Sequence, residues 1–451
     1  MSIITHKFLS SSAEQSFLGP QFGVATQNKS HDLRKMIIDL SDDAETGSGN
    51  DLMNAPISEH EVNLTFGTGS DTAGPDRITA KLIDNADRDE MKKCLTFLWN
   101  SSWSHGSFVK VWKEEDRAVL TKLGKDDYHE CNAYRTVSIT SCLGKRFEYI
   151  TCRRLTAVLE QVRFDQQQFS YLKNRSTTHA LLVLVEKIKS GLLAGKKAGV
   201  VFFDFADAFG SVDRDRLLVK IGRDFGISGK LFLHIRSFLS DCFARIRANS
   251  LVGEWIESLY GTSAGTRLGP LLFIMYMHDV PKCISPKFAN DFVAITIRSD
   301  LKNIMSDLQQ SIDKLVSWTE EWGMVLNETK TKVMLFGASG GEVVNVMIND
   351  QPIEQVTSHK YLGIILDTQL DFSLQAEYAA GKAKRPSAKV STLYDSREGI
   401  PVQTGISLYK TLVRPHMEYA IPVWAAMRAK AHSSIAAIEV ITGIVPVRIR
   451  I

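Results

Sequence analysis

The stretches GVVFFDFADAF at residues 199–209 and KFANDFVAITI at 287–297 decide the fold of this chain. The first begins with β-branched and aromatic residues, which are typical of a buried strand, and Asp204 follows this run. The second predicts a hairpin with Asn290 and Asp291 at its turn, where both residue types are favoured. Carboxylates at a strand end and at a neighbouring turn supply the oxygen ligands that divalent cations prefer. Asp204 and Asp291 therefore have the layout of one metal centre, although a capping or turn residue is the commoner explanation of a single aspartate at a strand end.

The charge distribution is a weaker indication. The net charge of the 451 residues is only +3, but residues 91–200 hold 19 Lys and Arg against 10 Asp and Glu, and residues 373–451 hold 11 against 5. Basic regions on both sides of a centre with acidic motifs suit a cleft that binds a polyanion. On charge alone, solvated helix faces are the better explanation.

Composition excludes several other classes of protein. The six cysteines are scattered, and no CxxC pair or cysteine–histidine cluster indicates a zinc site. A reduced intracellular protein is the simplest interpretation. No apolar run reaches the roughly 18–20 residues of a membrane-spanning helix, and the N-terminus lacks a signal-peptide pattern. We therefore expect no membrane association.

The remaining segments predict a mixture of helices and strands. Residues 1–55 are weakly patterned and include an acidic linker at 41–51, after which Ser58 and Glu61 form a capping-box pair. Apolar periodicity predicts helices at 143–160, 177–193, 301–324 and 408–424, the last kinked or broken at Pro415 and Pro422, and strands at 333–336, 343–348 and 361–366.

Eight segments together carry a family resemblance. In chain order they are AGPDRI (73–78), LTKLGKDDYHECNAYRTVSITSCLGKRFE (120–148), QFSYLKNRSTTHAL (168–181), FFDFADAFGSVD (202–213), GTSAGTRLGPLLFIMYMHDVP (261–281), FAND (288–291), LNETKTKVMLF (326–336) and KYLGIILD (360–367). This series resembles the reverse transcriptases of non-LTR retrotransposons (LINE elements), particularly the jockey and CR1-like groups. The resemblance extends from about Ile57 to about Trp424.

The resemblance implies an α+β fold of the right-hand polymerase type, with fingers, a palm built on an antiparallel sheet and a helical thumb. It implies an N-terminal extension at 1–55, fingers and the start of the palm at 56–198, the palm with its metal motifs at 199–345, and the primer grip with a partial thumb at 346–451. The implied partners are an RNA template, a DNA primer and dNTPs. The implied cofactors are two Mg²⁺ ions, for which Mn²⁺ substitutes.

Catalytic roles follow from the same resemblance. Asp204, Asn290 and Asp291 correspond to the acidic catalytic positions, with Asp204, the Phe205 carbonyl and Asp291 as metal ligands. Lys330, at the nucleotide, corresponds to a lysine suited to protonating the leaving pyrophosphate, although a solvated surface lysine explains it nearly as well.

Nucleotide-binding roles are implied for Lys122 and Arg135, which would hold the triphosphate as a point charge and a planar fork. Phe209 would exclude a 2′-hydroxyl by its bulk. Ala264 and Gly265 lie where the backbone would approach the nucleotide.

Template and primer contacts complete the implied site. Arg175 and Ser176 would face the template backbone, and Tyr361, Leu362 and Gly363 would hold the primer end.

This chain departs from the family pattern at chemical positions. Asn290 replaces the first aspartate of a usual pair, Ala264 replaces a glutamine, and Tyr171 and Leu172 stand where Phe and Arg are usual. Losing one negative charge between two dications lowers the rate of nucleotide addition roughly a hundredfold or more. A catalytically inactive nucleic-acid-binding remnant of such a polymerase therefore stays open beside the active enzyme.

Overall fold

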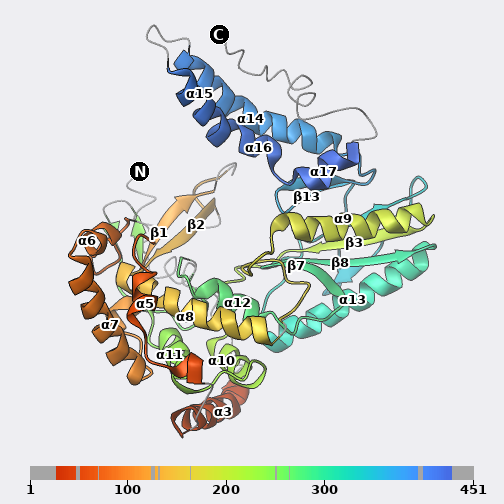
Figure 1. Cartoon of the computed structure of the whole chain (residues 1–451). Coiled ribbons are helices and arrows are strands. Elements are labelled where there is room, and N and C mark those ends of the chain that lie inside the picture. The colour runs from red at the N-terminus through yellow and green to blue at the C-terminus, as the bar shows by residue number, and fades with distance from the viewer. Residues whose placement is uncertain are drawn as a thin grey trace. The chain divides into compact units, whose positions relative to one another are not determined.

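The computed structural model divides into two compact units (Figure 1). Unit 1 comprises Met1–Gln166, Phe205–Val280 and Thr319–Val325, and unit 2 comprises Gln167–Asp204, Pro281–Trp318 and Leu326–Ile451. The structure describes residues 27–46, 51–69, 71–122, 127–130, 133–162, 164–248, 251–263, 265–394 and 400–428. No helix within these ranges is both long enough and apolar enough to cross a membrane.

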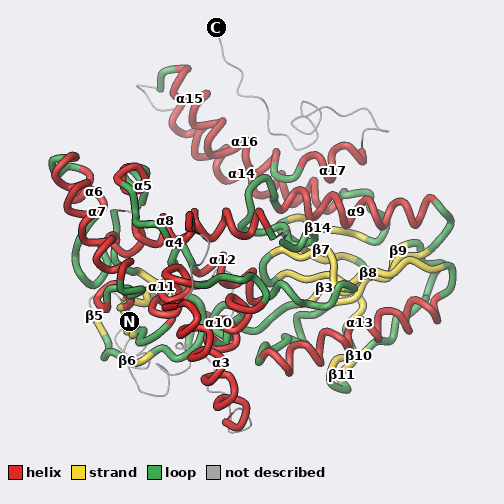
Figure 2. The backbone as a smooth tube through the Cα atoms, turned by 60° about the horizontal axis from the view of Figure 1, so that its bottom comes forward, coloured by secondary structure: helices red, strands yellow, loops and turns green. Residues whose placement is uncertain are grey.

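A five-stranded sheet forms the centre of unit 2, in the order β12-β9-β3-β8-β7 (Figure 2). Its strands are β3 (Lys197–Phe203), β7 (Ile284–Phe288), β8 (Asp291–Arg298), β9 (Lys332–Phe336) and β12 (Glu354–Gln355). The strand β3 lies in the middle and pairs antiparallel with β8 and β9, while β12 pairs with β9 in parallel. The predicted hairpin is confirmed, because β7 and β8 are antiparallel neighbours.

Helices cover both faces of β3, as Figure 1 shows. Alternate apolar residues of β3 pack in one core with α9 (Thr177–Leu193). The opposite face lies against α13 (Leu301–Trp322), so closely that a Cβ on Gly199 would come 2.5 Å from Cγ2 of Ile304. The predicted helices at these two places and the strand at β9 are confirmed, and the α+β fold class is confirmed with them.

Two predicted strands of unit 2 were wrong in extent. The run at 361–366 is not one strand but parts of a hairpin, β13 (Ser358–Tyr361) and β14 (Ile364–Asp367), because Leu362 and Gly363 adopt positive φ angles of 43° and 85°. In the run at 343–348 only β10 (Met347–Ile348) is a strand, which pairs with β11 (Gln351–Pro352). The apolar pattern there reflects burial without a sheet partner.

The C-terminal helices of unit 2 bear on a third expectation. They are α14 (Ser373–Tyr394), α15 (Val402–Leu408), the π-helical segment η4 (Tyr409–Val413), α16 (Arg414–Glu418) and α17 (Ile421–Arg428). The expected kink or break at Pro415 is an irregularity and not a break, because the π-helical segment η4 directly precedes α16, whose second residue is Pro415. The break near Pro422 is confirmed at Tyr419 and Ala420.

Unit 1 contains a second sheet with the order β2-β1-β4-β5, and β6 also pairs with β4. The strands are β1 (Glu114–Thr121), β2 (Tyr134–Ile139), β4 (Phe243–Ala248), β5 (Leu251–Val252) and β6 (Ile256–Glu257). The helices are α3 (Gln27–Thr46), α4 (Asp51–Asn54), α5 (Glu59–Asn63), α6 (Ala80–Asp84), α7 (Arg88–Ser104), the 3₁₀ turn η2 (Lys110–Lys113), α8 (Cys142–Gln161), α10 (Arg214–Arg223), α11 (Gly229–Leu239) and α12 (Gly269–Tyr276). The predicted helix at 143–160 is confirmed as α8.

Two N-terminal expectations have different outcomes. The capping box is confirmed, since the Glu61 N–H donates to Ser58 Oγ and the Ser58 N–H donates to Glu61 Oε2. The linker at 41–51 was wrong over 41–46, which belong to α3, and at Asp51, which begins α4; residues 47–50 lie outside the described ranges. Helix α3 is held by packing: a Cβ on Gly222 of α10 would come 2.7 Å from Cδ1 of Leu40.

Candidate metal centre

The end of β3 positions Asp204 through its backbone. The Asp204 N–H donates to Thr331 Oγ1 at 3.4 Å, and the Asp204 carbonyl accepts from the Asn327 N–H at 2.7 Å. Both partners come from the turn before β9, which neighbours β3 in the sheet. Within the described part of the chain, Asp204 Oδ2 is buried and has no hydrogen-bond partner. A buried carboxylate oxygen in that state is suited to accept a cation.

The β7–β8 turn brings the second carboxylate to the first. Phe288 pairs with Asp291, so the turn consists of Ala289 and Asn290 only, and the expectation that Asp291 lies at the turn was wrong by one residue. Asp291 begins β8, the neighbour of β3, which places it beside Asp204. Burial, and then the charge of Asp204, raise the pKa of Asp291 to about 6. The expected pairing of Asp204 with Asp291 is therefore present in the structure.

Two tyrosines also lie near Asp291. Burial and the Asp291 charge raise the pKa of Tyr171, which is half-exposed, and hold the pKa of Tyr361 well above its usual range. Tyr361 packs its ring 5.1 Å from that of Phe202, and its hydroxyl has no hydrogen-bond partner among the described residues. Burial is thus the main cause of the raised pKa of Asp291, and aromatic side chains form part of its surroundings.

The donor set suits a divalent cation but is incomplete by the family pattern. Two carboxylates and the Asn290 amide oxygen are hard oxygen donors of the kind that Mg²⁺ and Mn²⁺ accept. Among the residues that the structure describes, no three His, Cys, Asp or Glu side chains are arranged to hold a metal ion. The residues therefore fit a site with two carboxylates, at which Asn290 can contribute only a neutral oxygen.

Lys330 lies beside the centre. Its Nζ is 3.3 Å from Asp204 Oδ2, although the side chain is 67% exposed. The distance is that of an ion pair without hydrogen-bond geometry, since Oδ2 has no such partner. The backbone N–H of Lys330 donates to Asn327 Oδ1, which fixes the turn that carries it. An ammonium at this position balances charge near Asp204.

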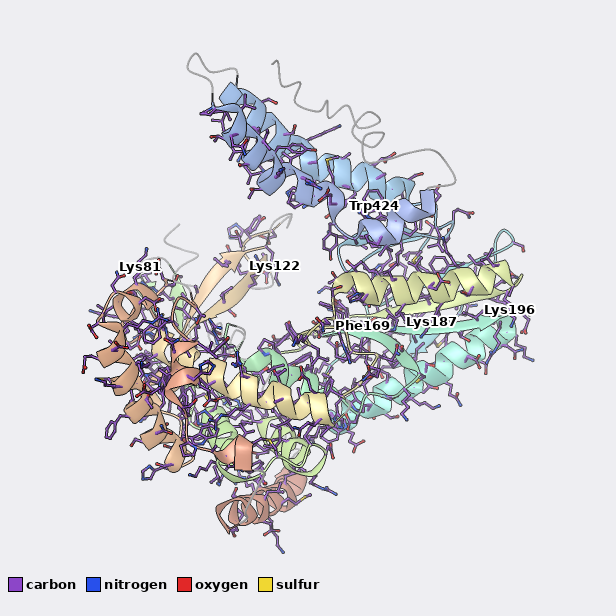
Figure 3. The ribbon with its side chains drawn as sticks, viewed as in Figure 1. Lys81, Lys122, Phe169, Lys187, Lys196 and Trp424 are labelled. Atoms are coloured by element: carbon purple, nitrogen blue, oxygen red, sulfur yellow. The ribbon has the colours of Figure 1, made fainter. Side chains whose placement is uncertain are left out.

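The residues expected to hold a triphosphate lie in unit 1, on the β1–β2 ribbon. Figure 3 labels Lys122 just beyond the end of β1. Its N–H donates to the Ala133 carbonyl, and Arg135 pairs with Leu120 two residues before it. Paired residues of neighbouring strands point to the same face, and residues two apart along one strand do so too. Lys122 and Arg135 therefore point to the same face of the ribbon. The structure thus brings these two cations together.

A loop of unit 1 approaches β2 closely at the expected glycine. Gly265 has a φ of 133°, and a Cβ there would come 2.3 Å from the Ser138 carbonyl oxygen of β2. Ala264 lies outside the described residues. Phe209 stacks on Phe273 of α12 with ring centroids 4.2 Å apart, and its carbonyl accepts from the Thr262 N–H. Phe209 is therefore fixed by packing.

Sequence reasoning missed the residue that anchors this loop. Glu148 of α8 is fully buried, and its Oε2 accepts from the N–H groups of Arg267 and Leu268 at 2.6 and 3.0 Å. Burial raises the pKa of Glu148 to about 7 against the effect of these two donors. Its position among apolar residues of a predicted helix was the available signal, because a buried glutamate needs a specific partner.

The remaining expected residues are in unit 2. Ser176 caps α9 by accepting from the His179 N–H, and the Arg175 guanidinium donates to the Gln168 carbonyl. Leu362 and Gly363 form the β13–β14 turn, where the Leu362 carbonyl accepts from the Tyr419 hydroxyl at 2.9 Å. Tyr361 is buried, and the charge of Asp291 contributes to its raised pKa.

The chain belongs to the family of reverse transcriptases (RNA-dependent DNA polymerases), whose model matches residues 122–366. The matched segment contains Lys122, the strand β2, both carboxylates and the β13–β14 turn. The resemblance to the reverse transcriptases of non-LTR retrotransposons is confirmed by the relatives.

Among these relatives is a probable RNA-directed DNA polymerase from the transposon X-element of Drosophila melanogaster, 26% identical over 73% of this chain and 37% of that protein. Another is the RNA-directed DNA polymerase from the mobile element jockey of the same species, which is 25% identical over 76% of this chain and 38% of that protein. The chain thus spans less than two fifths of the length of either. Among solved structures, an apo telomerase from Candida tropicalis aligns with this chain at 12% identity and a TM-score of 0.39. The alignment covers 66% of this chain and 62% of the telomerase chain.

Proposed function

We propose that this chain is an RNA-directed DNA polymerase domain, which adds dNTPs to the 3′ end of a DNA primer opposite an RNA template. The proposal is carried by one observation: Asp204 and Asp291 meet at the ends of two adjacent strands, closely enough for one charge to raise the pKa of the other carboxyl. Membership of the reverse transcriptase family supports it.

We further propose Mg²⁺ as the cofactor, with Mn²⁺ as its substitute, held by Asp204, Asp291 and the Phe205 carbonyl. When bound, such ions would lower the pKa of the primer hydroxyl and balance the charge of the triphosphate. The protein's own contribution is to hold two acidic oxygens in a partly buried place, where electrostatic interactions are stronger than in water. Asn290 would add a neutral oxygen to this set.

The nucleotide would be bound by charge and by shape. Lys122 and Arg135 would pair with phosphate oxygens, Arg135 through two parallel hydrogen bonds. Phe209, held by its stack on Phe273, would block the space of a 2′-hydroxyl, and Gly265 would leave room for the base pair. Lys330 would donate a proton to the leaving pyrophosphate.

Template and primer would be held by other parts of the chain. We propose Arg175 and Ser176 as template contacts and residues 361–363 as the primer grip. In polymerase terms, 56–198 would form the fingers and the start of the palm, 199–345 the palm, and 346–451 the primer grip and a partial thumb. These partners would place the protein inside the cell, in the nucleus or cytoplasm.

A specific observation favours a second candidate, a remnant that binds nucleic acid without catalysis. Asn290 stands at the turn in place of a carboxylate, and the described residues contain no cluster of three metal-binding side chains. Such a remnant would bind a primer–template through phosphate contacts, with strong salt dependence and no response to Asp204→Ala.

Primer extension on an RNA template separates the two candidates. The unmodified chain, Asp204→Ala and Asn290→Asp would be assayed in Mg²⁺ and in Mn²⁺. Extension by the unmodified chain that Asp204→Ala abolishes supports the polymerase. Extension only by Asn290→Asp supports a polymerase fold silenced at one ligand. No extension by any version, together with salt-dependent primer–template binding, supports the remnant.

A further inference from the structure

We propose that Gln168 and Ser170, together called the brace, position the β7–β8 turn, and hence Asp291, for cation binding. The proposal rests on the proposed function in one respect, the role of Asp291 as a ligand. The brace would be a pair of positioning residues: neither side chain touches a substrate, and both act through the backbone of Ala289.

The turn needs outside support because of its conformation. Ala289 is the first residue of a two-residue hairpin turn and has a φ of 54°, whereas Asn290 has no positive φ. Hairpin turns with this pattern favour glycine at the first position, because a Cβ is unfavourable in the left-handed region. Ala289 is also only 5% exposed, so water does not readily satisfy its N–H. An alanine here is stable only if neighbouring groups hold it.

The brace supplies those groups. The Ala289 N–H donates to Ser170 Oγ at 2.9 Å and to Gln168 Oε1 at 3.1 Å. Ser170 Oγ donates in turn to Gln168 Oε1 at 2.9 Å, and the Ser170 N–H donates to the same oxygen at 3.2 Å. Gln168 is 2% exposed and Ser170 is fully buried. One amide oxygen thus gathers three donors, and the N–H of the strained residue is one of them.

The brace is itself anchored to the strand before the turn. Gln168 forms a parallel bridge with Lys287 of β7. The Phe169 N–H donates to the Lys287 carbonyl, and the Lys287 N–H donates to the Gln167 carbonyl, both at 2.9 Å. Figure 3 labels Phe169 within this segment. The segment therefore continues the edge of the sheet beyond β7, and it holds the turn from a fixed backbone.

This geometry predicts a link between the brace and cation affinity. Asp291 follows the turn directly, so any relaxation of Ala289 toward a right-handed conformation would shift Asp291 relative to Asp204. Replacing a residue that orients a metal ligand without touching the metal typically lowers metal affinity or activity about 10- to 100-fold. A purely structural polar cluster would lower stability without this effect.

The test combines three variants and two measurements. Gln168→Met keeps the volume but removes the acceptor, Ser170→Ala removes the other acceptor, and Gln168→Met with Ala289→Gly adds a residue that adopts positive φ freely. The control is Gln355→Met, since Gln355 also accepts from a buried backbone N–H, that of Val344, away from the turn. The measurements are Mn²⁺ affinity by titration and hydrogen exchange of the Ala289 amide, in the unmodified and Asn290→Asp backgrounds. Asp204→Ala is titrated beside them to show whether Mn²⁺ binds at the proposed centre.

We expect Gln168→Met and Ser170→Ala each to speed exchange at Ala289 and to weaken Mn²⁺ binding about tenfold. Adding Ala289→Gly should restore most of the affinity, and Gln355→Met should retain it. Unchanged exchange at Ala289, unchanged affinity despite faster exchange, or no rescue by glycine would each overturn the proposal. If Mn²⁺ binding is absent from both backgrounds, or is insensitive to Asp204→Ala, the proposed function fails at its metal centre and the positioning role fails with it. The exchange rates then show whether the brace holds the turn at all.

Discussion

The metal centre has two corners, Asp204 at the end of β3 and Asp291 after the β7–β8 turn. These two corners are held by different means. Asp204 ends the central strand of its sheet, and backbone and hydroxyl groups of the neighbouring β9 turn fix its peptide. Asp291 follows a tight turn whose first residue has an unfavourable φ, and two side chains from a different segment hold that turn. The first corner is a consequence of strand pairing, whereas the second depends on individual side chains. The second corner is therefore the one at which single substitutions have graded effects.

The largest effect should come from the first corner. Asp204→Asn removes a charge from a group whose backbone stays in place, so the fold should persist while primer extension falls roughly a thousandfold. Steady-state extension rates in Mn²⁺ measure the loss. Asp313→Asn, on the exposed face of α13, should leave the rate unchanged, and an equal loss in both variants would contradict the role of Asp204.

A smaller effect in the opposite direction is expected at the second corner. Asn290→Asp restores a carboxylate and should raise extension about a hundredfold. Three carboxylates in one place also repel each other, so the melting temperature should fall without divalent cations and recover when Mg²⁺ is added. Calorimetry with and without Mg²⁺ checks this, and a melting temperature that does not respond to Mg²⁺ would argue against a shared metal centre.

In unit 1 a side chain from a distant segment also holds a loop backbone, as at Asp291. There Glu148 accepts from the N–H groups of Arg267 and Leu268. The pKa of Glu148 is raised to about 7 in the folded protein, above its ordinary value of 4.5. The folded state therefore binds more protons than the unfolded state between these values, and stability should fall as the pH rises through this window.

Glu148→Gln should remove this pH dependence. Relative to the variant, the unmodified protein should lose about 2 kcal/mol of unfolding free energy between pH 5 and pH 7. Urea unfolding at several pH values measures the difference. Glu186→Gln, on an exposed position of α9, serves as the control and should follow the unmodified protein. Parallel profiles for Glu148→Gln and the unmodified protein would contradict the assignment.

The smallest effect on cation binding is expected from Lys330. Its ammonium lies 3.3 Å from Asp204 Oδ2 and would compete with a cation for that oxygen. Because the side chain is largely exposed, Lys330→Met should raise Mn²⁺ affinity only about two- to fivefold. Lys302→Met on α13 is the control for loss of a positive charge. A lower affinity in Lys330→Met would mean that the lysine supports the centre.

Particular residues show how far sequence patterns reach. The run of β-branched and aromatic residues before Asp204 predicted the central strand, and the alternation after Asp291 predicted β8, because both patterns follow from burial of a sheet. The strand at 361–366 was wrong because its apolar residues continue through a turn, and apolar pattern alone does not register a positive φ at Leu362. The linker at 41–46 was wrong because tertiary packing of Leu40 against Gly222 outweighs an acidic local composition.

By itself, the sequence determined the order of the motifs, the family and the two carboxylates, since these depend on residue type and on spacing along the chain. Only the tertiary structure decided what holds those carboxylates in place. Gln168 and Ser170 lie about 120 residues before Ala289, and Glu148 lies about 120 residues before Leu268. Long-range hydrogen bonds of this kind have no periodicity in the sequence, because they depend on which backbone groups become buried and need a partner once the sheets have formed.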